Sequence, residues 1–387
     1  MRHPLNLEKR LEIRKRENSL RVLRHSTDLI DFSSNDYLGF SKNPQIHQAA
    51  VDLVQANGLS GINGATGSRL LTGNHKLYET AEAYIKGFHE AGAALIFNSG
   101  YDANLGFFSS VPQRGDIILF DELVHASIRE GIRLSHARAF KFTHNKLSDL
   151  EDLLKKYNVR KENEGINLYI VSESVFSMDG DLAPLEGLAN LADAYNAFLI
   201  VDEAHATGVF GENGRGLVQH LDLHNRVYAR IITFGKALGA HGAAILGNKI
   251  LTGYLINFSK SFIYTTALSP HSVATILASY MLLDQESTCR DLNSLKNNIE
   301  TFKSQLELRQ ISSQFIKSES PIQCCVIPGN DRVKQVAMCL QEKGFDVRPI
   351  LSPTVPTGME RIRICLHSFN TQNDIARLVE QIAIFIK

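Results

Sequence analysis

Lys236 stands in the segment TFGKALGAHGAA (233–244), between small residues and close behind the apolar run ARIIT (229–233). Most lysines extend into water, whereas glycine and alanine neighbours let other groups approach this one closely. An amine that acts as a nucleophile must first lose its proton, and a confined site beside a positive charge lowers the pKa of a lysine. The segment therefore predicts a reactive amine, although a surface lysine is the commoner case for any single position.

A candidate phosphate-binding turn follows the apolar run AALIF (93–97). There the chain reads Asn98-Ser99-Gly100-Tyr101 and continues into the helix-like segment DANLGFFSS. A Ser-Gly turn that opens a helix presents free N–H groups and the positive end of the helix dipole to an anion. An ordinary strand-to-helix turn has a similar composition, so the turn becomes informative only together with other residues.

Polar side chains follow three further apolar runs. His125 comes after DIILF at a helix start, Glu173 and Ser177 lie in the loop after NLYIV, and Asp202 and His205 follow AFLIV. Each has an ordinary structural explanation when it is taken alone, namely a capping or packing role for His125 and a helix N-cap for Asp202. Their order along the chain carries more information than any one of them.

In open α/β sheets, ligands bind at the carboxyl ends of the strands. A phosphate-type turn, a histidine, a serine, Asp-x-x-His and a lysine follow consecutive strands here, and this set fits pyridoxal phosphate. The aldehyde of this cofactor needs a lysine, and its pyridine nitrogen needs a carboxylate to stay protonated. Its phosphate needs amides and hydroxyls, and its ring needs a flat group stacked on one face.

The elements that must position these residues alternate regularly. From about residue 44 to 285, short apolar runs, several of them apolar throughout, alternate with amphipathic stretches of helical length, such as KLSDLEDLLKKY and PLEGLANLADAY. This pattern predicts a mostly parallel α/β sheet that is covered by helices on both faces. Residues 286–387 combine long helical stretches with short strands and predict a smaller α+β domain. Residues 1–43 predict an amphipathic helix from Leu5 to about Arg24, then a short strand in LIDFSS.

Composition and charge exclude several function classes. The 387 residues include 41 basic and 41 acidic side chains, so no basic field attracts nucleic acid or an anionic membrane. The start of the chain lacks the apolar core of a signal peptide, and no apolar run reaches the roughly 18 residues of a membrane span. The five cysteines lack metal-ligand spacing and are interpreted as reduced core thiols. We therefore expect a cytoplasmic protein with no bound metal, whose partners are small molecules or another copy of the chain.

The chain resembles the α-oxoamine synthases, which are pyridoxal phosphate enzymes of fold type I. The resemblance extends from about residue 31 to about residue 365. The segments that carry it are DFSSNDYLGF, GATGSRLLTGNH, FNSGYDANLG, DELVHASIREG, SVFSMDGDLAPL, VDEAHATGVFGENGRG, TFGKALGAHGAA, FIYTTALSP and SPTVPTGMERIRI. The combination of VDEAHATGxxGxxGRG with TFGKALG is highly specific. It implies a large, mostly parallel seven-stranded sheet domain, a small C-terminal α+β domain and an N-terminal helical segment.

The resemblance also implies a role for each candidate at the cofactor ring. Lys236 would form the Schiff base and accept the Cα proton of the substrate, and Asp202 would pair with the pyridine nitrogen. His125 would stack on the ring, and Ser177 and His205 would hydrogen-bond to its phenolic oxygen.

At the phosphate, the resemblance implies the amides of Gly100 and Tyr101 together with Thr233. Ser99 and Glu173 are counted among the cofactor-binding residues as well. The family's sites lie at the interface of a homodimer, so Thr266 of the partner subunit would also reach the phosphate.

Asn35 and Arg363 are implied to bind the carboxylate of the amino acid, a task that suits the fork of an arginine. Arg361 lies two residues away and would share the same face of a strand, so only the family pattern selects Arg363. Arg21, in the N-terminal helix, is a candidate for recognition of the acyl chain.

The implied reaction is a decarboxylative condensation of an amino acid with an acyl thioester, carried by CoA or by an acyl-carrier protein. TFGKALGAHGAA, FIYTTALSP and SPTVPTG most resemble the member that joins L-alanine to a pimeloyl group in biotin biosynthesis. DELVHASIREGIRL and VFGENGRG also resemble the glycine and acetyl-CoA ligase, while serine palmitoyltransferase and 5-aminolevulinate synthase share the framework. Leu351 stands where many enzymes of the biotin pathway have an arginine.

Two other classes use the same fold. A plain aminotransferase lacks the HAS, DEAHATG and TFGKALG segments in this combination. A transcription regulator would carry a DNA-binding domain, but only about thirty residues precede DFSSN. Both are less favoured than an α-oxoamine synthase.

Overall fold

The computed structural model describes residues 3–23 and 28–386. Their contacts form two compact units, and each is described by itself. The larger unit comprises residues 36–177 and 182–292, and the smaller one comprises the described residues of 1–35, 178–181 and 293–387. Boundaries near 43 and 285 were expected from the sequence.

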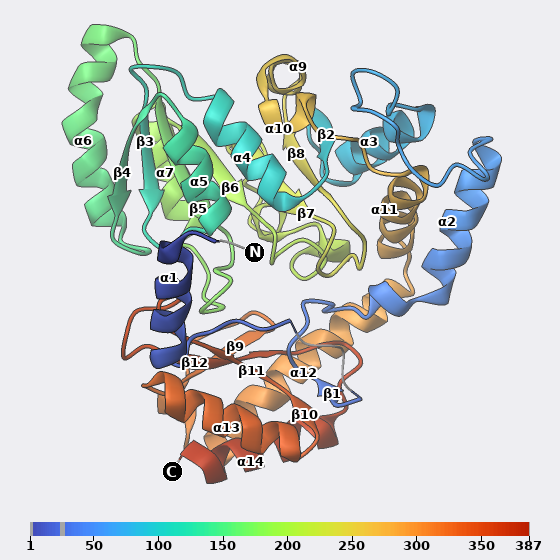
Figure 1. The fold of residues 1–387 in the computed structure, drawn as a ribbon. Helices are drawn as coiled ribbons and strands as arrows, with labels where there is room; N and C mark the ends of the chain where they lie inside the picture. The colour runs from blue at the N-terminus through green and yellow to red at the C-terminus, as the bar shows by residue number, and fades with distance from the viewer. Residues whose placement is uncertain (1–2, 24–27, 387) are drawn as a thin grey trace. The chain divides into compact units, whose positions relative to one another are not determined.

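A seven-stranded sheet forms the centre of the larger unit (Figure 1). Its strands are β2 (Ala93–Phe97), β3 (Ile117–Asp121), β4 (Arg138–Phe142), β5 (Leu168–Glu173), β6 (Phe198–Asp202), β7 (Ala229–Thr233) and β8 (Ala243–Gly247). Their order is β2-β8-β7-β6-β5-β3-β4, and the five strands from β7 to β4 are mutually parallel. Only β8 runs antiparallel to both of its neighbours. The predicted seven-stranded, mostly parallel sheet is confirmed.

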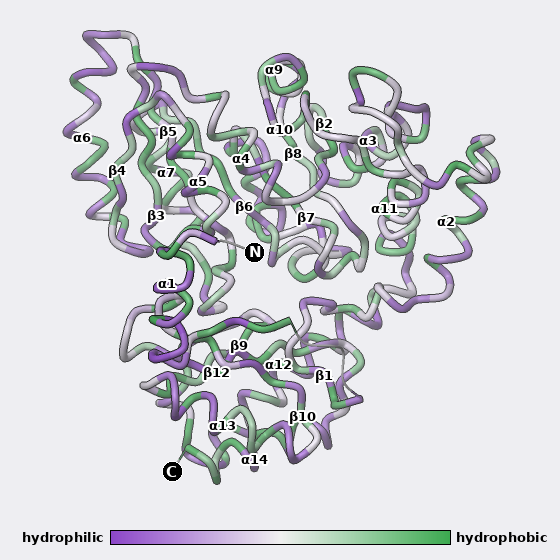
Figure 2. Tube along the Cα trace, viewed as in Figure 1, coloured by the Kyte–Doolittle hydropathy of each residue, from purple (hydrophilic) through white to green (hydrophobic). Residues whose placement is uncertain are grey.

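The central strands are mostly apolar because helices cover both faces of the sheet. Every residue of β5 is buried, and Figure 2 shows the central strands as mostly hydrophobic. β8 is absent from the predicted apolar runs. It follows β7 after a connection of nine residues, which is too short for a crossover helix and therefore returns the chain antiparallel.

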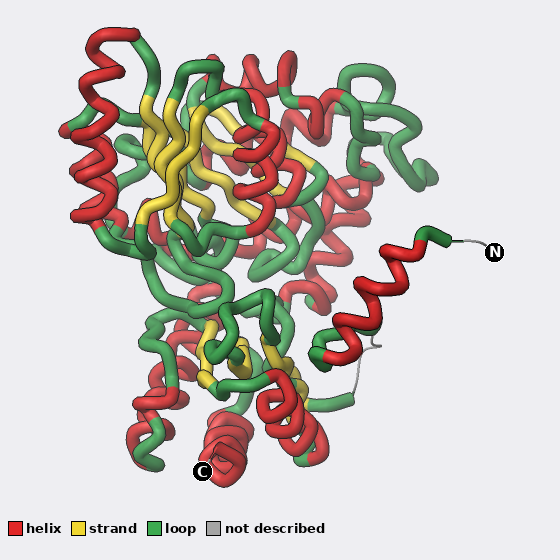
Figure 3. The backbone as a smooth tube through the Cα atoms, turned by 60° about the vertical axis from the view of Figure 1, so that its left-hand side comes forward, coloured by secondary structure: helices red, strands yellow, loops and turns green. Residues whose placement is uncertain are grey.

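The helices flank the strands in a layered arrangement (Figure 3). The helices of the larger unit are η1 (Phe40–Lys42), α2 (Pro44–Ala56), α3 (Lys76–Phe88), α4 (Gly100–Ser110), α5 (Ala126–Leu134), α6 (Leu147–Glu164), α7 (Leu185–Ala194), η2 (Glu212–Gly214), α8 (Leu217–His220), α9 (Lys249–Phe258), α10 (Lys260–Ile263) and α11 (Pro270–Leu283). On one face of the sheet, Phe107 and Phe108 of α4 join residues of α5, α9 and α10 in a single buried core. This packing fixes the start of α4 and of α5 against the strand ends.

The smaller unit contains the antiparallel sheet β11-β12-β9 and the parallel pair β1-β10, with helices packed beside them. Its elements are α1 (Leu5–Arg16), β1 (Ile30–Asp31), η3 (Ser312–Gln314), β9 (Ile322–Val326), α13 (Asn330–Glu342), β10 (Phe345–Asp346), β11 (Arg348–Ile350), β12 (Arg361–Cys365) and α14 (Gln372–Ile386), and α12 (Thr288–Leu308) begins just before the unit boundary. The predicted α+β character is confirmed.

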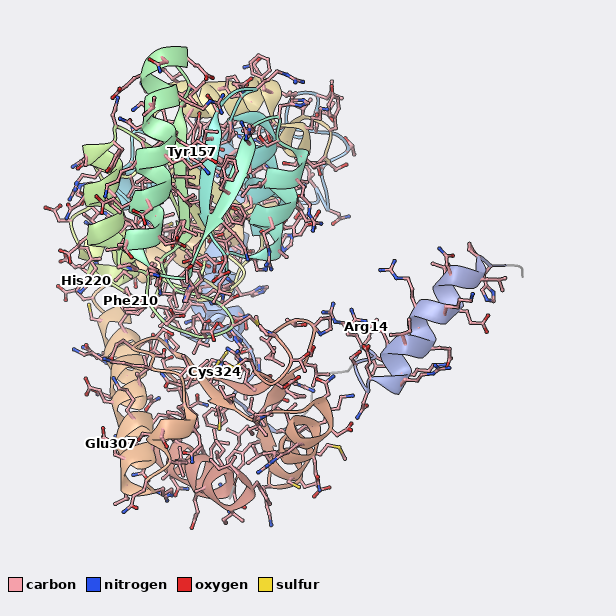
Figure 4. All side chains as sticks on the ribbon, turned by 90° about the vertical axis from the view of Figure 1, so that its left-hand side faces the viewer. Arg14, Tyr157, Phe210, His220, Glu307 and Cys324 are labelled. Atoms are coloured by element: carbon pink, nitrogen blue, oxygen red, sulfur yellow. The ribbon has the colours of Figure 1, made fainter. Side chains whose placement is uncertain are left out.

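The N-terminal helix is shorter than predicted. It ends at Arg16 rather than near residue 24, because Asn18 adopts a left-handed φ of 48°, a conformation that commonly terminates helices. The end predicted at Arg24 lies outside the described residues. No residue of α1 is buried, and Figure 4 labels Arg14 on its surface.

The five cysteines are all free thiols. Cys324, labelled on β9 in Figure 4, is buried together with Cys325 and Cys365. Cys289 is exposed, so the expectation of a core thiol is wrong at this position. Within residues 3–23 and 28–386, no helix combines the length and the apolar character that crossing a bilayer requires.

Candidate active site

Lys236 lies in the larger unit beside His205. Its Nζ is 2.7 Å from Nε2 of the histidine, whose Nδ1 is 2.7 Å from the hydroxyl of Tyr37. Tyr37 is fully buried and His205 nearly so, while Lys236 is partly exposed. The imidazole therefore links a buried phenol to the amine, and the two bonds fix the orientation of its ring.

The local fold explains why these residues meet. His205 follows β6 and Lys236 follows β7, which are neighbouring parallel strands whose carboxyl ends lie at one edge of the sheet. Gly208 has a φ of 76°, and a Cβ there would lie 2.5 Å from the Cβ of Ala237. Because glycine alone permits this approach, the loop that carries His205 packs against the segment that carries Lys236.

A chain of hydrogen bonds leads from Asp202 to His125. The amide of Asn104 donates to Oδ2 of Asp202 at 2.8 Å and to the hydroxyl of Ser127 at 3.1 Å, and this hydroxyl lies 2.7 Å from Nδ1 of His125. The other carboxylate oxygen of Asp202 accepts a bond of 2.9 Å from the backbone N–H of Ala204. Asp202 thus has two donors in a buried position, an environment that suits an anion.

The same chain of bonds assigns the proton of His125. Nδ1 of His125 accepts from the backbone N–H of Ser127 at 3.2 Å and therefore carries no proton, so the Ser127 hydroxyl donates to it. The neutral ring then carries its proton on Nε2. Desolvation by neighbouring groups is the main cause that lowers the pKa of His125, and the charge of Lys236 lowers it further, whereas the charge of Asp202 raises it. These effects favour the neutral imidazole.

Glu173 ends β5 directly across from Asp202 in the parallel register. It is 3% exposed, and its Oε1 accepts a bond from the backbone N–H of His125 at 2.5 Å. Burial, together with the charge of Asp202, raises the pKa of Glu173 to about 8. Ser177 lies four residues further on, in a turn, and is partly exposed.

The candidate phosphate turn begins α4. The hydroxyl of Ser99 accepts from the N–H of Asp102 at 3.0 Å and caps the helix, so that Gly100 and Tyr101 are its first two residues. Amides at these positions have no partner within a helix and point toward an anion. A Cβ on Gly100 would lie 2.6 Å from Cγ2 of Thr233, so glycine lets the turn approach the end of β7.

Thr266 is exposed, and its carbonyl oxygen accepts a bond of 2.6 Å from the side chain of Asn98, one residue before Ser99. The role expected of its counterpart in a partner subunit remains a prediction.

The predicted carboxylate-binding residues lie in the smaller unit. Arg363 donates from one guanidinium nitrogen to Oδ1 of Asn35 at 2.9 Å and from another to Sγ of Cys365 at 2.9 Å. Arg361 shares the face of β12, as expected, but forms an ion pair with Asp179 that is largely buried. The two arginines therefore differ in their partners, which the sequence did not reveal.

Arg21 donates to the hydroxyl of Thr354 at 3.2 Å in an exposed position of the smaller unit. Thr354 belongs to the same segment as Leu351.

Two residues of the site were missed from the sequence. Tyr37 lies within DFSSNDYLGF and Asn104 within FNSGYDANLG, but neither was assigned a role. The available signal was a tyrosine among loop residues and an asparagine on the apolar face of a helix. Such a polar residue is buried only when a partner satisfies it, and here the partners are His205 and Asp202.

The larger unit fits pyridoxal phosphate by its chemistry. It presents an amine at Lys236, a buried carboxylate at Asp202, a neutral imidazole at His125 and a helix start that a glycine leaves open. Among the described residues, no group of three or more His, Cys, Asp or Glu side chains could hold a metal ion.

Residues 27–382 match the family model of aminotransferase class I and II. The 8-amino-7-oxononanoate synthase of Emericella nidulans is 41% identical over 97% of this chain and 94% of its own length. A putative 8-amino-7-oxononanoate synthase of Geobacillus kaustophilus is 40% identical over 94% of this chain and 90% of its own.

Solved structures agree with this relationship. The 8-amino-7-oxononanoate synthase of Francisella tularensis superposes with a TM-score of 0.76 at 29% identity, covering 92% of this chain and 97% of its own. A structure of serine palmitoyltransferase (SPT) with its pyridoxal phosphate (PLP) internal aldimine reaches a TM-score of 0.85 at 26% identity, covering 93% of this chain and 87% of its own. The chain thus belongs to the aminotransferase class I and II family and, within it, to the α-oxoamine synthases, which are pyridoxal-phosphate-dependent acyltransferases.

Proposed function

We propose that this enzyme condenses L-alanine with a pimeloyl thioester and releases CO2, the free thiol and 8-amino-7-oxononanoate, a step of biotin biosynthesis. The acyl carrier is CoA or an acyl-carrier protein. The placement of Lys236 beside His205, just after the strand that neighbours the strand of buried Asp202, carries the reaction type. Relatives of about 40% identity that are named for this activity support the choice of substrates.

Lys236 is the proton carrier of the proposed reaction. When bound, pyridoxal phosphate supplies an aldehyde for the substrate amine and a cationic ring that stores an electron pair. Nζ of Lys236 removes the proton from Cα of alanine and later returns one to the same carbon. His205, 2.7 Å away, holds Nζ in line, and Asp202 keeps a proton on the pyridine nitrogen.

Other residues bind and orient. The amides of Gly100 and Tyr101 and the hydroxyl of Thr233 hold the phosphate at the start of α4, while the ring of His125 covers one face of the cofactor. Arg363 binds the carboxylate of alanine, and Asn35 orients the guanidinium. Arg361 is engaged in an ion pair with Asp179, whereas Arg363 bonds to Asn35, and this difference supports the choice of Arg363.

The bonds balance without an external oxidant or reductant. Cα of alanine bonds to the carbonyl carbon of the thioester, and the C–S bond breaks, so that the thiolate leaves with the electron pair and takes up a proton. The bond from Cα to the carboxylate then breaks and releases CO2. Loss of CO2 removes the group that Arg363 holds, which favours release of the product.

The proposal includes a homodimer in the cytoplasm, with Thr266 of the partner subunit at the phosphate. It also assigns Arg21 to the distal carboxylate of the pimeloyl chain. Arg21 contacts Thr354, three residues after Leu351, and so places a guanidinium in the segment where many enzymes of this pathway have an arginine.

A substrate matrix tests the proposal. Alanine, glycine and serine are crossed with pimeloyl-, acetyl-, succinyl- and palmitoyl-CoA while thiol release is followed, and we expect alanine with the pimeloyl donor to have the highest kcat/KM. Equal or better turnover of glycine with acetyl-CoA would overturn the substrate assignment. The likeness to SPT makes serine with the palmitoyl donor the second candidate.

A further inference from the structure

Glu173 connects the end of β5 to the start of α5. Its Oε1 accepts the backbone N–H of His125, which is the N-cap residue of α5, and its side chain is almost completely buried. The ring of the same histidine is held separately, through Ser127. Glu173 therefore fixes the main chain of His125, while Ser127 fixes the direction of its ring.

Two carboxyl groups share this part of the sheet edge. Glu173 and Asp202 are direct partners in the parallel register, so their side chains leave the same face from strands that are about 4.8 Å apart. Carboxylates on directly paired positions repel each other, and burial of both side chains makes the ionisation of both costly. One proton is therefore expected to be held by the pair.

Hydrogen-bond donors decide which carboxyl carries the negative charge. Asp202 accepts from the side chain of Asn104 and from the N–H of Ala204, whereas the bond described for Glu173 comes from the N–H of His125. The carboxyl group that accepts more hydrogen bonds is more stable as an anion. The charge then resides on Asp202, and Glu173 keeps the proton.

The surrounding charges agree with this assignment. Burial is the largest cause that raises the pKa of Glu173 to about 8, followed by the charge of Asp202 on β6. Asp121 on β3 acts in the same direction, whereas Lys236 after β7 and the N–H of His125 act against it. The balance leaves Glu173 neutral at neutral pH.

We propose that Glu173 is a positioning residue that acts as a neutral carboxylic acid, holding His125 in place without adding a second negative charge beside Asp202. This rests on the proposed function insofar as His125 stacks on the cofactor ring. A second anion beside His125 would favour its imidazolium form, and an imidazolium would be repelled by a cationic ring. A neutral acid anchors the histidine and avoids this effect.

Two substitutions separate anchoring from charge. Glu173→Gln keeps an oxygen that accepts from His125 and is always neutral, whereas Glu173→Ala removes the anchor. We expect the cofactor to dissociate from Glu173→Gln within about threefold of the wild-type rate, and from Glu173→Ala about tenfold faster or more. If cofactor binding depended on a negative charge at Glu173, Glu173→Gln would lose the cofactor as fast as Glu173→Ala. Equal loss in both variants would overturn the proposal.

The stability of the apoprotein gives a readout that requires neither cofactor nor substrate. Folded Glu173 binds its proton up to a pH of about 8, whereas the unfolded chain releases it near 4.5, so wild-type stability from this group falls as pH rises through this window. Glu173→Gln lacks this loss. Its urea midpoint should therefore rise relative to wild type as the pH increases from about 4.5 to about 8, and the difference should level off above this window.

Glu122→Gln is the matched control, because this partly exposed carboxyl forms an ion pair with the exposed Lys141 on the neighbouring strand. Its midpoint relative to wild type should not follow the same trend with pH.

A difference between Glu173→Gln and wild type that stays constant with pH would show that Glu173 is already ionised, and the proposal would be wrong. If Glu173→Ala does not fold, the Gln comparison decides alone. If the Glu173 variants give the expected dissociation rates and urea midpoints but the wild-type enzyme does not turn over alanine, the proposed substrates are wrong and the role of Glu173 stands.

Discussion

Asn104 donates to both Asp202 and Ser127, so one buried amide joins the carboxylate expected at the pyridine nitrogen to the histidine expected over the ring. The amide comes from α4, the helix whose first turn forms the candidate phosphate site. A single helix therefore reaches three parts of the cofactor site. This relationship makes Asn104 a sensitive position, although it contacts none of the reacting atoms.

We predict that Asn104→Leu binds the cofactor less tightly. The change keeps the approximate volume but removes a hydrogen bond to a buried carboxylate, which is worth about 1.5–3 kcal/mol, so dissociation should accelerate about tenfold to a hundredfold. Absorbance of the bound cofactor during dilution measures the rate. Asn158→Ala, which removes an exposed bond to Glu162, is the control. An unchanged rate in Asn104→Leu would show that Asp202 does not depend on this amide.

Lys236→Ala should abolish the covalent attachment of the cofactor. Borohydride treatment of the wild-type protein should leave the cofactor fixed to the peptide that contains residue 236, as peptide mass spectrometry can show. The variant should lose both this label and turnover, by roughly a thousandfold or more, since it lacks the proton carrier. Lys249→Ala, at an exposed helix start, should retain both. A label on another lysine would refute the assignment.

The sequence predicted much of the larger unit because its strands have a simple signature. The runs AALIF, RAFKF and ARIIT coincide with β2, β4 and β7, since strands that helices cover are rich in apolar residues. β8 was not among the predicted runs, because its first two residues, Ala243 and Ala244, are also the end of the lysine segment TFGKALGAHGAA. The N-terminal helix was extended too far because the left-handed turn at Asn18 is not visible in hydrophobic spacing.

The site was predictable only where residues follow strands. His125, Asp202 and Lys236 could be found because each comes soon after an apolar run. Asn104 could not, because its importance depends on a carboxylate that is 98 positions away in the chain. The alternation of a strand likewise places Arg361 and Arg363 on one face, and only their three-dimensional partners distinguish them.

Substitution of these two arginines should have different effects. Arg363→Lys loses the fork that matches a carboxylate, so KM for the amino acid should rise about tenfold to a hundredfold with a small change in stability. Arg361→Lys disturbs the pair with Asp179 and should mainly lower the urea midpoint. Steady-state kinetics and urea unfolding measured on both variants separate the effects. If KM rises only in Arg361→Lys, the two roles are reversed.

The ion pair of Glu203 and Arg230 should contribute strongly to stability. Both side chains are almost completely buried, with Nε of the arginine 2.9 Å from the carboxylate, and Arg230 also donates to the carbonyl of Arg215. Glu203→Gln leaves the buried guanidinium without a counter-charge, which costs about 3–5 kcal/mol.

The matched control is Asp193→Asn, in an exposed pair with Arg226. Its cost should stay below about 1 kcal/mol. Urea unfolding of the apoproteins measures both changes, and similar midpoints for the two variants would contradict the structural importance of the buried pair.

Gly100→Ala should impair the phosphate turn in a way that a second substitution repairs. The new Cβ would lie 2.6 Å from Cγ2 of Thr233, and such overpacking costs about 1–3 kcal/mol and displaces the start of α4. Thr233→Ser removes Cγ2 but keeps the hydroxyl that is proposed to bind phosphate. The double variant should therefore recover most of the cofactor affinity that Gly100→Ala loses. Fluorescence titration of the apoproteins measures these affinities. Additive losses in the double variant would mean that the contact with the Thr233 methyl group is not the cause.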